Sequence, residues 1–264
     1  MAKIIRKGHQ LENDMTRLEE TRHQQQSRCR MILRKAVLPM LAADLLLVLI
    51  GVLTGLVFLF LGIAVIGDIS ALLIIFLIYS PGTALQDREQ ILSVGIRGEQ
   101  HAAEVLAGLP DDYTVYQDVS VSFDGKSSEI DNIVVGRTGV FALETKNHGG
   151  YIRGGYEDRQ WQQEKIGCGG TPYSREFYSP VKQVGTHVYR LAGFLRSKGV
   201  PVYVAGGVYF TNSDTSVNIS GHGRIPVFAS SRREEGALRQ FILSGREQLD
   251  SRSVGRICAL LDSL

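Results

Sequence analysis

A long apolar tract near the N-terminus constrains this chain more than any other feature of its sequence. From Ala36 to Tyr79 the only charged residues are Asp44 and Asp68. Within the tract, Leu45–Gly67 contains only apolar and small residues, and about 20 such residues are enough to span the hydrocarbon core of a membrane. The tract therefore predicts a membrane anchor.

The whole tract is close to twice the length of one span, so we expect a helical hairpin. Its two helices would cover about residues 36–58 and 59–79, joined by a very short turn. One long span followed by an interfacial helix is the alternative. We expect Asp44 and Asp68 near the helix ends or the turn, with functional intramembrane acids as the alternative. A cleaved signal peptide is not expected, because the tract far exceeds an h-region.

The charges before the tract predict its orientation. The basic residues of this segment are Lys3, Arg6, Lys7, Arg17, Arg22, Arg28, Arg30, Arg34 and Lys35, against the acidic residues Glu12, Asp14, Glu19 and Glu20. Basic residues close to a span favour the cytoplasmic side. Two spans would return the chain to that side, so we expect a multi-pass protein of a prokaryotic plasma (inner) membrane with a cytoplasmic N-terminus. A single span would instead place everything after Ser80 outside.

Residues 1–35 are expected to form a basic cytosolic helix that runs into the membrane. Its C-terminal part carries Arg28, Arg30, Arg34 and Lys35, which would contact anionic lipid. A coiled coil is less favoured, because the apolar positions Leu11, Met15 and Leu18 stop after two turns.

After Pro81 the pattern is that of a water-soluble α/β domain. We expect a linker and helix start over 81–93, a core over 94–215, and a strand and helices over 216–264 that complete the domain. The expected helices are about 90–108, 180–198, 233–243 and 251–261, and the expected strands are 113–123, two in the hairpin 129–147, 200–210 and 225–229. Residues 147–178 read as a loop. This order predicts a mixed sheet flanked by helices.

Composition excludes a disulfide scaffold and a structural zinc site. The three cysteines, Cys29, Cys168 and Cys258, are far apart and show no CxxC spacing, which fits a reducing compartment. The 29 basic and 27 acidic residues nearly balance, so net charge alone does not indicate a nucleic-acid binder.

The segment EIDNIVVGRTGVFALETKN, Glu129–Asn147, reads as a β-hairpin with acids where apolar residues would be expected. If its turn is centred on Arg137-Thr138, Asp131 faces Glu144 across the two strands. Lys146 lies two residues beyond Glu144 and therefore on the same face. The hairpin thus predicts two carboxylates and an ammonium group converging at its open end, and a one-residue bulge would break this arrangement.

Two carboxylates this close repel each other unless one is protonated or a cation lies between them. Oxygen ligands suit Mg²⁺ or Mn²⁺, which can assist attack on a phosphodiester. Lys146 would orient the attacking water or offset charge on the phosphate. A surface cluster of Asp131, Glu144 and Lys146 without chemistry is the alternative.

The helix near Gln90 also carries an acidic residue where an apolar residue would be expected. On a helical wheel Glu99 falls inside the apolar arc, and an acid on a buried stripe should be paired or bound to a metal. Gly95 and Gly98 would let the helix approach the sheet closely. A partly exposed Glu99 at the edge of the arc is the alternative.

The segments GIRGEQHAAEVL, EIDNIVVGRTGVFALETKN and SPVKQVGTHVYRL resemble the nuclease-related domain (NERD), a branch of the PD-(D/E)xK restriction-endonuclease-like nucleases, over roughly Val94–Phe210. The resemblance implies an α-β-β-β-α-β core with a mixed sheet. It also implies cleavage of nucleic acid with Mg²⁺ (or Mn²⁺), and DNA is the favoured substrate over RNA. A homodimer would be usual for this superfamily.

Carried over by position, the resemblance makes Asp131, Glu144 and Glu99 metal ligands, Lys146 the catalytic lysine, and Gln183 a catalytic glutamine beside the metal or phosphate. An ordinary flank position on an amphipathic helix is the alternative for Gln183. Two departures from the family pattern, Asn132 where His is common and Ser179 where Asn is common, put substrate contacts in doubt. His101, His148 and His187 are expected to be surface or core residues rather than ligands.

Basic and aromatic residues mix in the segment after the hairpin. Arg153, Arg159, Lys165 and Trp161 are the expected nucleic-acid contacts, holding phosphates and stacking bases. A solvated loop whose Trp161 packs on the sheet is the alternative. The sequence as a whole predicts a membrane-anchored metal-dependent nuclease, and the alternative is a catalytically inactive, membrane-tethered nucleic-acid-binding or scaffold module.

Overall fold

A computed structural model describes residues 1–8, 10–79, 82–166, 170–246 and 248–264. The chain divides into two compact units. One is helical and comprises Leu11–Ser93, and the other is an α/β unit made of Met1–Gln10 and Val94–Leu264.

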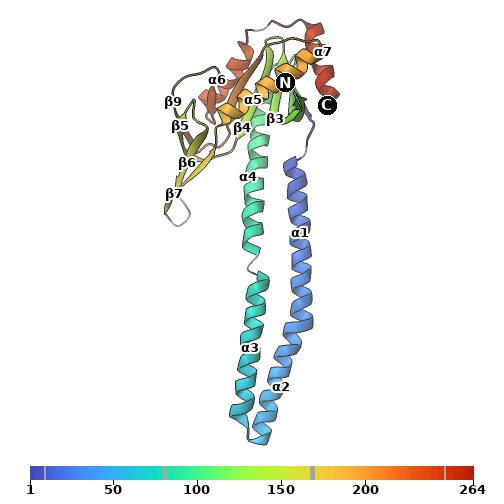
Figure 1. Ribbon diagram of the computed structural model, residues 1–264, viewed down its shortest axis with the longest axis vertical. Coiled ribbons are helices and arrows are strands. Elements are labelled where there is room, and N and C mark those ends of the chain that lie inside the picture. Colours follow the sequence, from blue (N-terminus) through green and yellow to red (C-terminus); the bar gives the residue numbers. More distant parts are fainter. Residues whose placement is uncertain (9, 80–81, 167–169, 247) are drawn as a thin grey trace. The chain divides into compact units, whose positions relative to one another are not determined.

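The helical unit contains the apolar tract. Helix α1 (Gln10–Ile32) continues through a π-helical turn (Leu33–Val37) into α2 (Leu38–Thr54), and α3 (Val57–Tyr79) returns alongside α2 (Figure 1). The expected helical hairpin is therefore present, but the predicted break between residues 58 and 59 is wrong. The turn comes earlier because Gly55 takes a φ of 73°, a left-handed conformation that ends helices and that glycine adopts without strain.

By length and composition, one helix of the described chain could cross a membrane. It is the continuous helical stretch Leu11–Thr54, while the described apolar part of the second arm, Leu61–Phe76, is shorter. The structure is consistent with a membrane anchor at this tract, and two separate spans stay a prediction.

The two acids of the tract do not lie where we expected them. Asp44 is in the middle of α2 and buried, with its carboxylate against the bare backbone of Gly67 on α3. Asp68 is in the middle of α3 and exposed. The prediction of positions near helix ends or the turn is wrong for both. At Asp44 the small residue Gly67 leaves room for a polar side chain between two apolar helices.

A six-stranded sheet forms the centre of the α/β unit. Its order is β1 (Lys3–Arg6), β2 (Thr114–Phe123), β3 (Lys126–Gly136), β4 (Gly139–Lys146), β8 (Val204–Phe210) and β10 (Val227–Ala229). Strands β2, β3 and β4 are antiparallel, whereas β1 pairs with β2, and β8 with β4 and β10, in parallel. The mixed sheet expected from the sequence is confirmed.

Alternating side chains give this sheet two apolar faces. One face, with Val134, Phe141 and Leu143, packs against α4 (Gly82–Ala107) and α6 (Arg232–Leu243). The other, with Ile133, Val135, Val140 and Ala142, packs against α5 (Pro180–Ser197) and α7 (Ser251–Asp262). In chain order, α4, β2, β3, β4, α5 and β8 follow the α-β-β-β-α-β order expected from the sequence, with three strands of a second sheet inserted between β4 and α5.

The first residues of the chain differ from expectation. The sequence predicted one helix over residues 1–35, but Lys3–Arg6 form β1 at the edge of the main sheet, paired in parallel with Thr114–Gln117 of β2. The alternation of this four-residue strand was too short to recognise, and its pairing partner lies more than a hundred residues away in the sequence.

The segment expected to be a loop over 147–178 forms three strands of a second sheet instead. Its order is β7 (Pro172–Tyr178), β6 (Gln160–Ile166), β5 (Gly150–Gly155) and β9 (Thr215–Ser220). Only one side of this sheet is covered, with Ile152 and Trp161 against Val181 and Val184 of α5. Most side chains of β7 are exposed, so the segment lacks the hydrophobic signal of a core strand.

Candidate active site

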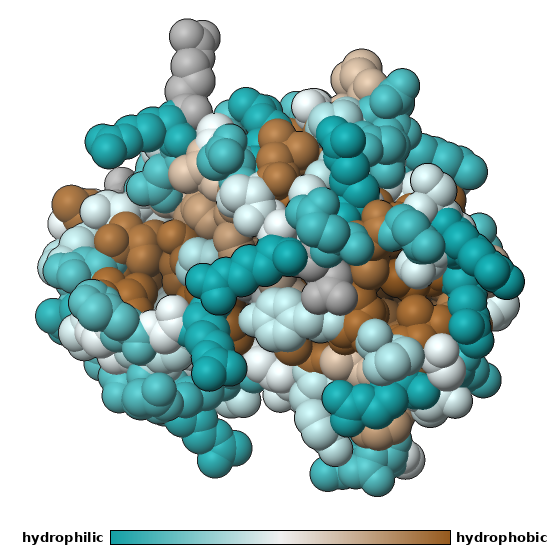
Figure 2. All heavy atoms as spheres, turned by 90° about the horizontal axis from the view of Figure 1, so that it is seen from above, coloured by the Kyte–Doolittle hydropathy of each residue, from teal (hydrophilic) through white to brown (hydrophobic). Residues whose placement is uncertain are grey.

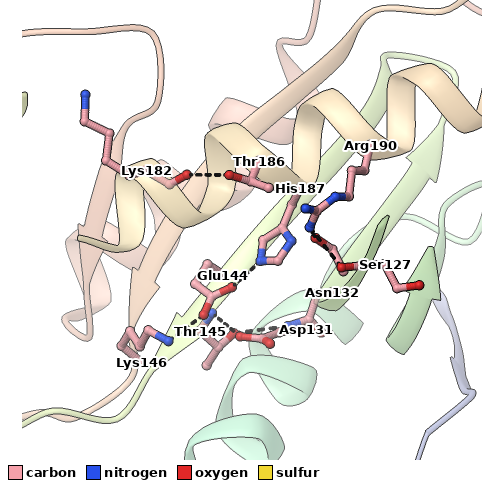
Figure 3. A network of polar contacts seen from close by, with 11 residues as sticks. Ser127, Asp131, Asn132, Glu144, Thr145, Lys146, Lys182, Thr186, His187 and Arg190 are labelled. Carbon is pink, nitrogen blue, oxygen red and sulfur yellow. Dashed lines mark hydrogen bonds and ion pairs between the residues drawn. The ribbon is translucent and has the colours of Figure 1, made fainter. Parts of the chain in front are cut away.

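The β3–β4 hairpin has the register that the sequence predicted. Gly136 pairs with Gly139 around the two-residue turn Arg137-Thr138, and the pairing runs without a bulge to Asn132 and Leu143. Asp131 and Glu144 are the next residues on the two strands, and Glu144 points toward His187 of α5 (Figure 3). The hairpin therefore brings an acid from each arm together at its open end.

Asp131 is held by the backbone of the opposite strand. The Thr145 N–H donates to Asp131 Oδ2 at 2.7 Å. Burial raises the pKa of the Asp131 carboxyl well above its usual range, and the neighbouring charge of Glu144 raises it further. Lys146 and the Thr145 N–H act in the opposite direction, and Glu99 adds a smaller repulsion. Asp131 thus lies in a negative field that a nearby positive charge would relieve.

Glu144 is buried, and both of its oxygens are engaged. Only 1% of its side chain is exposed. Lys146 Nζ lies 2.5 Å from Glu144 Oε1, and His187 Nε2 on α5 lies 3.1 Å from Glu144 Oε2 (Figure 3). A carboxylate taken out of water needs such partners, and here they also fix its rotamer.

His187 is the site residue that the sequence reasoning undervalued. It is 5% exposed, and its other ring nitrogen, Nδ1, is buried without a hydrogen-bond partner among the described residues. A signal was present in the sequence, because His187 lies three residues after Val184 and four before Leu191, on the apolar stripe of α5. A polar residue on a buried stripe is the same anomaly that singled out Glu99.

Glu99 is paired with a residue from the far N-terminus. Arg6 on β1 places Nη2 at 2.7 Å from Glu99 Oε2 and Nε at 2.9 Å from Asp118 Oδ2. Asp118 takes a φ of 53°, a left-handed conformation that aspartate tolerates. Glu99 is thus paired with an arginine, and 19% of its side chain is exposed, as in the alternative of a partly exposed position.

Asn132 has a structural task. It is 1% exposed, accepts from Gln117 Nε2 at 3.3 Å and donates from Nδ2 to Thr145 Oγ1 at 3.1 Å. Asn132 therefore ties together three strands beside Asp131. Ser179 likewise is buried and caps α5, with its hydroxyl accepting from the Lys182 N–H. The two departures from the family pattern therefore lie at supporting positions.

Gln183 lies on the first turn and a half of α5 and is half-buried. Its backbone N–H donates to Ser179 O, and its side chain makes no hydrogen bond within the described part of the chain. It is one helical turn before His187, and it is His187 that contacts Glu144. The catalytic role of Gln183 stays a prediction.

The expected nucleic-acid contacts divide into two groups. Trp161 is fully buried and donates its indole N–H to Gly155 O at 3.0 Å, so the alternative in which it packs on the sheet holds and base stacking by Trp161 is wrong. Arg153 is exposed but bound to Glu164 at 2.6 Å. Arg159 is exposed and Lys165 half-buried, and their contacts with nucleic acid stay predictions.

The donor set fits a hard divalent cation held by two carboxylates. Asp131 and Glu144 lie close enough to repel each other, and Mg²⁺ typically takes one or two carboxylates together with water and substrate oxygens. The described residues contain no group of three or more His, Cys, Asp or Glu side chains arranged for a metal. Glu99, expected as a third ligand, comes from α4 and pairs with Arg6, and its charge contributes to the raised pKa of Asp131. Its role as a ligand stays a prediction.

Comparisons with known proteins support the resemblance seen in the sequence. Residues 94–211 match the family model of the nuclease-related domain, a segment that includes all five expected catalytic residues. An uncharacterized protein of Bacillus anthracis is 39% identical over 71 residues, and this stretch covers 26% of the present chain and 34% of that protein. The chain therefore spans about a third of that curated relative's length. No solved structure matches significantly.

Proposed function

We propose that this protein is a membrane-anchored, metal-dependent nuclease that hydrolyses phosphodiester bonds, with DNA as the favoured substrate, at the cytoplasmic face of a prokaryotic plasma membrane. The observation that carries the proposal is the convergence of Asp131, Glu144 and Lys146 at the open end of the β3–β4 hairpin. This convergence lies inside the segment that matches the nuclease-related domain.

In this proposal Asp131 and Glu144 hold Mg²⁺ or Mn²⁺. When bound, the ion supplies Lewis-acid activation of the scissile phosphate and compensation of its charge. The Thr145 N–H keeps the Asp131 carboxylate pointed toward Glu144, and His187 keeps Glu144 from turning away. Groups that orient a ligand in this way sharpen a site without touching substrate.

Lys146 is the positively charged group of the site. Its Nζ is 2.5 Å from Glu144 Oε1, and its side chain is 22% exposed and therefore partly accessible to solvent. A cation in this place can orient an attacking water and offset the charge that develops on the phosphate. Arg6 neutralises Glu99 next to the site, which limits the number of negative charges near an incoming phosphate.

A second candidate function rests on one specific observation. Lys146 and His187 occupy both oxygens of Glu144, an arrangement that would also suit a buried polar network with no chemistry. In that case the protein is a catalytically inactive, membrane-tethered nucleic-acid-binding or scaffold module.

Plasmid cleavage separates the two functions. The full chain, purified in detergent, is incubated with supercoiled plasmid in Mg²⁺, Mn²⁺ or EDTA. We expect nicking only with metal, and loss of at least about a hundredfold in rate for Glu144→Gln and Lys146→Met. The matched control Glu104→Gln changes an exposed acid on α4 whose side chain is 80% exposed, and should keep wild-type activity. No metal-dependent nicking by wild type would leave the inactive module as the function, and equal nicking by wild type and Glu144→Gln would contradict the proposed site.

The membrane topology needs its own test. C-terminal fusions to green fluorescent protein and to alkaline phosphatase are made in parallel. Two spans predict a fluorescent, phosphatase-negative protein, because the basic N-terminal segment and the C-terminus would then share the cytoplasm. Phosphatase activity without fluorescence would show a single span and an external α/β unit.

A further inference from the structure

Strands β6 and β7 form an antiparallel hairpin with two distinct faces. Trp161 pairs with Phe177, Gln163 with Arg175, and Lys165 with Tyr173. Directly paired residues project to the same side of a sheet, and successive residues to opposite sides. These six residues therefore share one side, which we call the cationic face. Trp161, which packs against α5, and Gln163 are buried at its base, and Lys165, Tyr173 and Arg175 form its accessible outer part. The other side, the acidic face, carries Gln162, Glu164, Ser174 and Glu176.

The charges of the hairpin are sorted by face. The cationic face carries Lys165 and Arg175 and no acid, whereas the acidic face carries Glu164 and Glu176. Arg153 of β5 pairs with Gln162, so it lies on the acidic face, where it binds Glu164 at 2.6 Å. Within the described residues neither Lys165 nor Arg175 makes an ion pair. The two cations of the cationic face are thus available to an external anion.

The cationic face is continuous with the candidate active site. His148, two residues after Lys146, stacks on Phe177 with ring centroids 4.6 Å apart, and its Nδ1 lies 3.3 Å from Gln163 Oε1. The Gln163 amide also donates to Gly149 O at 2.7 Å. These contacts join the cationic face to the segment that follows β4, immediately after Lys146.

The electrostatics agree with this geometry. Burial lowers the pKa of His148, and the positive charges of Lys146, Lys165 and Arg175 lower it further, against the hydrogen bond with Gln163. The three cations therefore belong to one positive region that begins at the site and extends onto the hairpin.

The residues of this positive region are of the kinds that bind nucleic acid. The surface in Figure 2 mixes hydrophilic and hydrophobic side chains, and the chain as a whole has a net charge of only +2. A sorted pair of cations beside an exposed aromatic ring, Tyr173 at 49% exposure, is the combination that binds nucleic-acid backbone and stacks on bases. Lys165 and Arg175 are diagonal neighbours, roughly 7–8 Å apart, so both can contact phosphates of one strand.

We infer that the cationic face of the β6–β7 hairpin is the surface along which DNA reaches the active site, with Lys165 and Arg175 contacting phosphates and Tyr173 lying against sugar and base. This inference rests on the proposed nuclease function. Arg175 and Tyr173 take the place of Arg153 and Trp161 among the expected nucleic-acid contacts. Both lie on β7, a strand that was not predicted from the sequence.

The test measures binding separately from cleavage. The full chain in nanodiscs of zwitterionic lipid is titrated with fluorescein-labelled duplex DNA in EDTA, and the anisotropy gives Kd over a range of salt concentrations. Lys165→Gln and Arg175→Gln should each weaken binding and reduce the slope of log Kd against log salt by about 1, the value for one lost phosphate contact. The matched control Arg153→Gln removes one cation from the other face and should leave the slope unchanged.

Two outcomes overturn the inference. One is an unchanged slope in Lys165→Gln and Arg175→Gln, and the other is an equal loss of slope in Arg153→Gln, which would mean that only net charge matters. The outcome is independent of catalysis, because the metal is absent. If the protein binds DNA through this face but never cleaves it, the binding surface stands and the nuclease proposal fails. If the protein cleaves DNA and both variants bind it as tightly as wild type, only the inference about this face fails.

Discussion

Replacement of Gly98 by alanine tests how closely α4 packs beside the site. An added Cβ would lie 2.7 Å from Asn147 Cβ and 2.9 Å from Thr211 Oγ1. The Asn147 side chain is tied to the same helix by its hydrogen bond to Val94 O at 2.5 Å. A Cβ atom moves only with its backbone, so Asn147 cannot turn aside and the helix or the strand end has to shift.

Two opposing free-energy terms decide whether Gly98→Ala stabilises or destabilises the protein. Alanine is favoured over glycine inside a helix by about 1 kcal/mol, whereas overpacking a well-filled site costs about 1–3 kcal/mol. We therefore expect Gly98→Ala to lower the free energy of unfolding by about 1 kcal/mol. Gly255 on α7 is exposed, and a Cβ there would meet nothing within 4 Å. Gly255→Ala should thus raise the free energy of unfolding by about 0.5–1 kcal/mol.

Tryptophan fluorescence gives the measurement. The chain has a single tryptophan, and Trp161 is fully buried against α5 and β8, so its emission reports the unfolding of the α/β unit. Urea titrations of the full chain in detergent compare the two variants with wild type. A Gly98→Ala protein that gains as much stability as Gly255→Ala would refute the close approach of α4 to the segment after β4.

Two further expectations follow from the contacts of the α/β unit. Arg6→Ala leaves Glu99 and Asp118 without their shared cation and should destabilise the unit by roughly 2 kcal/mol, with partial recovery in Arg6→Lys; no change in urea unfolding would contradict the bridging role of Arg6. Burial raises the pKa of the Tyr209 phenol from 10.0 to about 12. The folded protein then holds this proton more tightly than the unfolded chain, so stability is retained below pH 10 and falls between pH 10 and 12. That decline should be shallower in Tyr209→Phe, and equal slopes for the two proteins would argue against a buried, protonated Tyr209.

The hairpin could be predicted from the sequence because its determinants are local. Alternation fixes the faces of β3 and β4, and a two-residue turn fixes their register, so the meeting of Asp131 and Glu144 follows without knowledge of the rest of the fold. Glu99 was identified for a similar reason, since a helical wheel places it on the buried stripe.

The features that could not be predicted depend on contacts between residues far apart in the sequence or on patterns too weak to recognise. Arg6 is 93 residues from Glu99 in the sequence and lies before the apolar tract, so its pairing became visible only with β1 in place. Strands β5 to β7 were missed because they bury few side chains and are rich in glycine, tyrosine and charge. The turn of the apolar hairpin was misplaced because periodicity cannot locate a break inside a uniformly apolar tract.

Manganese binding tests the central claim most directly, namely that the acids of the β3–β4 hairpin hold a divalent cation. The full chain in detergent is titrated with Mn²⁺, and free Mn²⁺ is followed by electron paramagnetic resonance for wild type, Asp131→Asn, Glu144→Gln and the control Glu104→Gln. The proposed site predicts one bound ion per chain in wild type and control, and an affinity at least about tenfold weaker in each of the other two variants. The same Mn²⁺ affinity in all four proteins, or no binding to wild type, would contradict it.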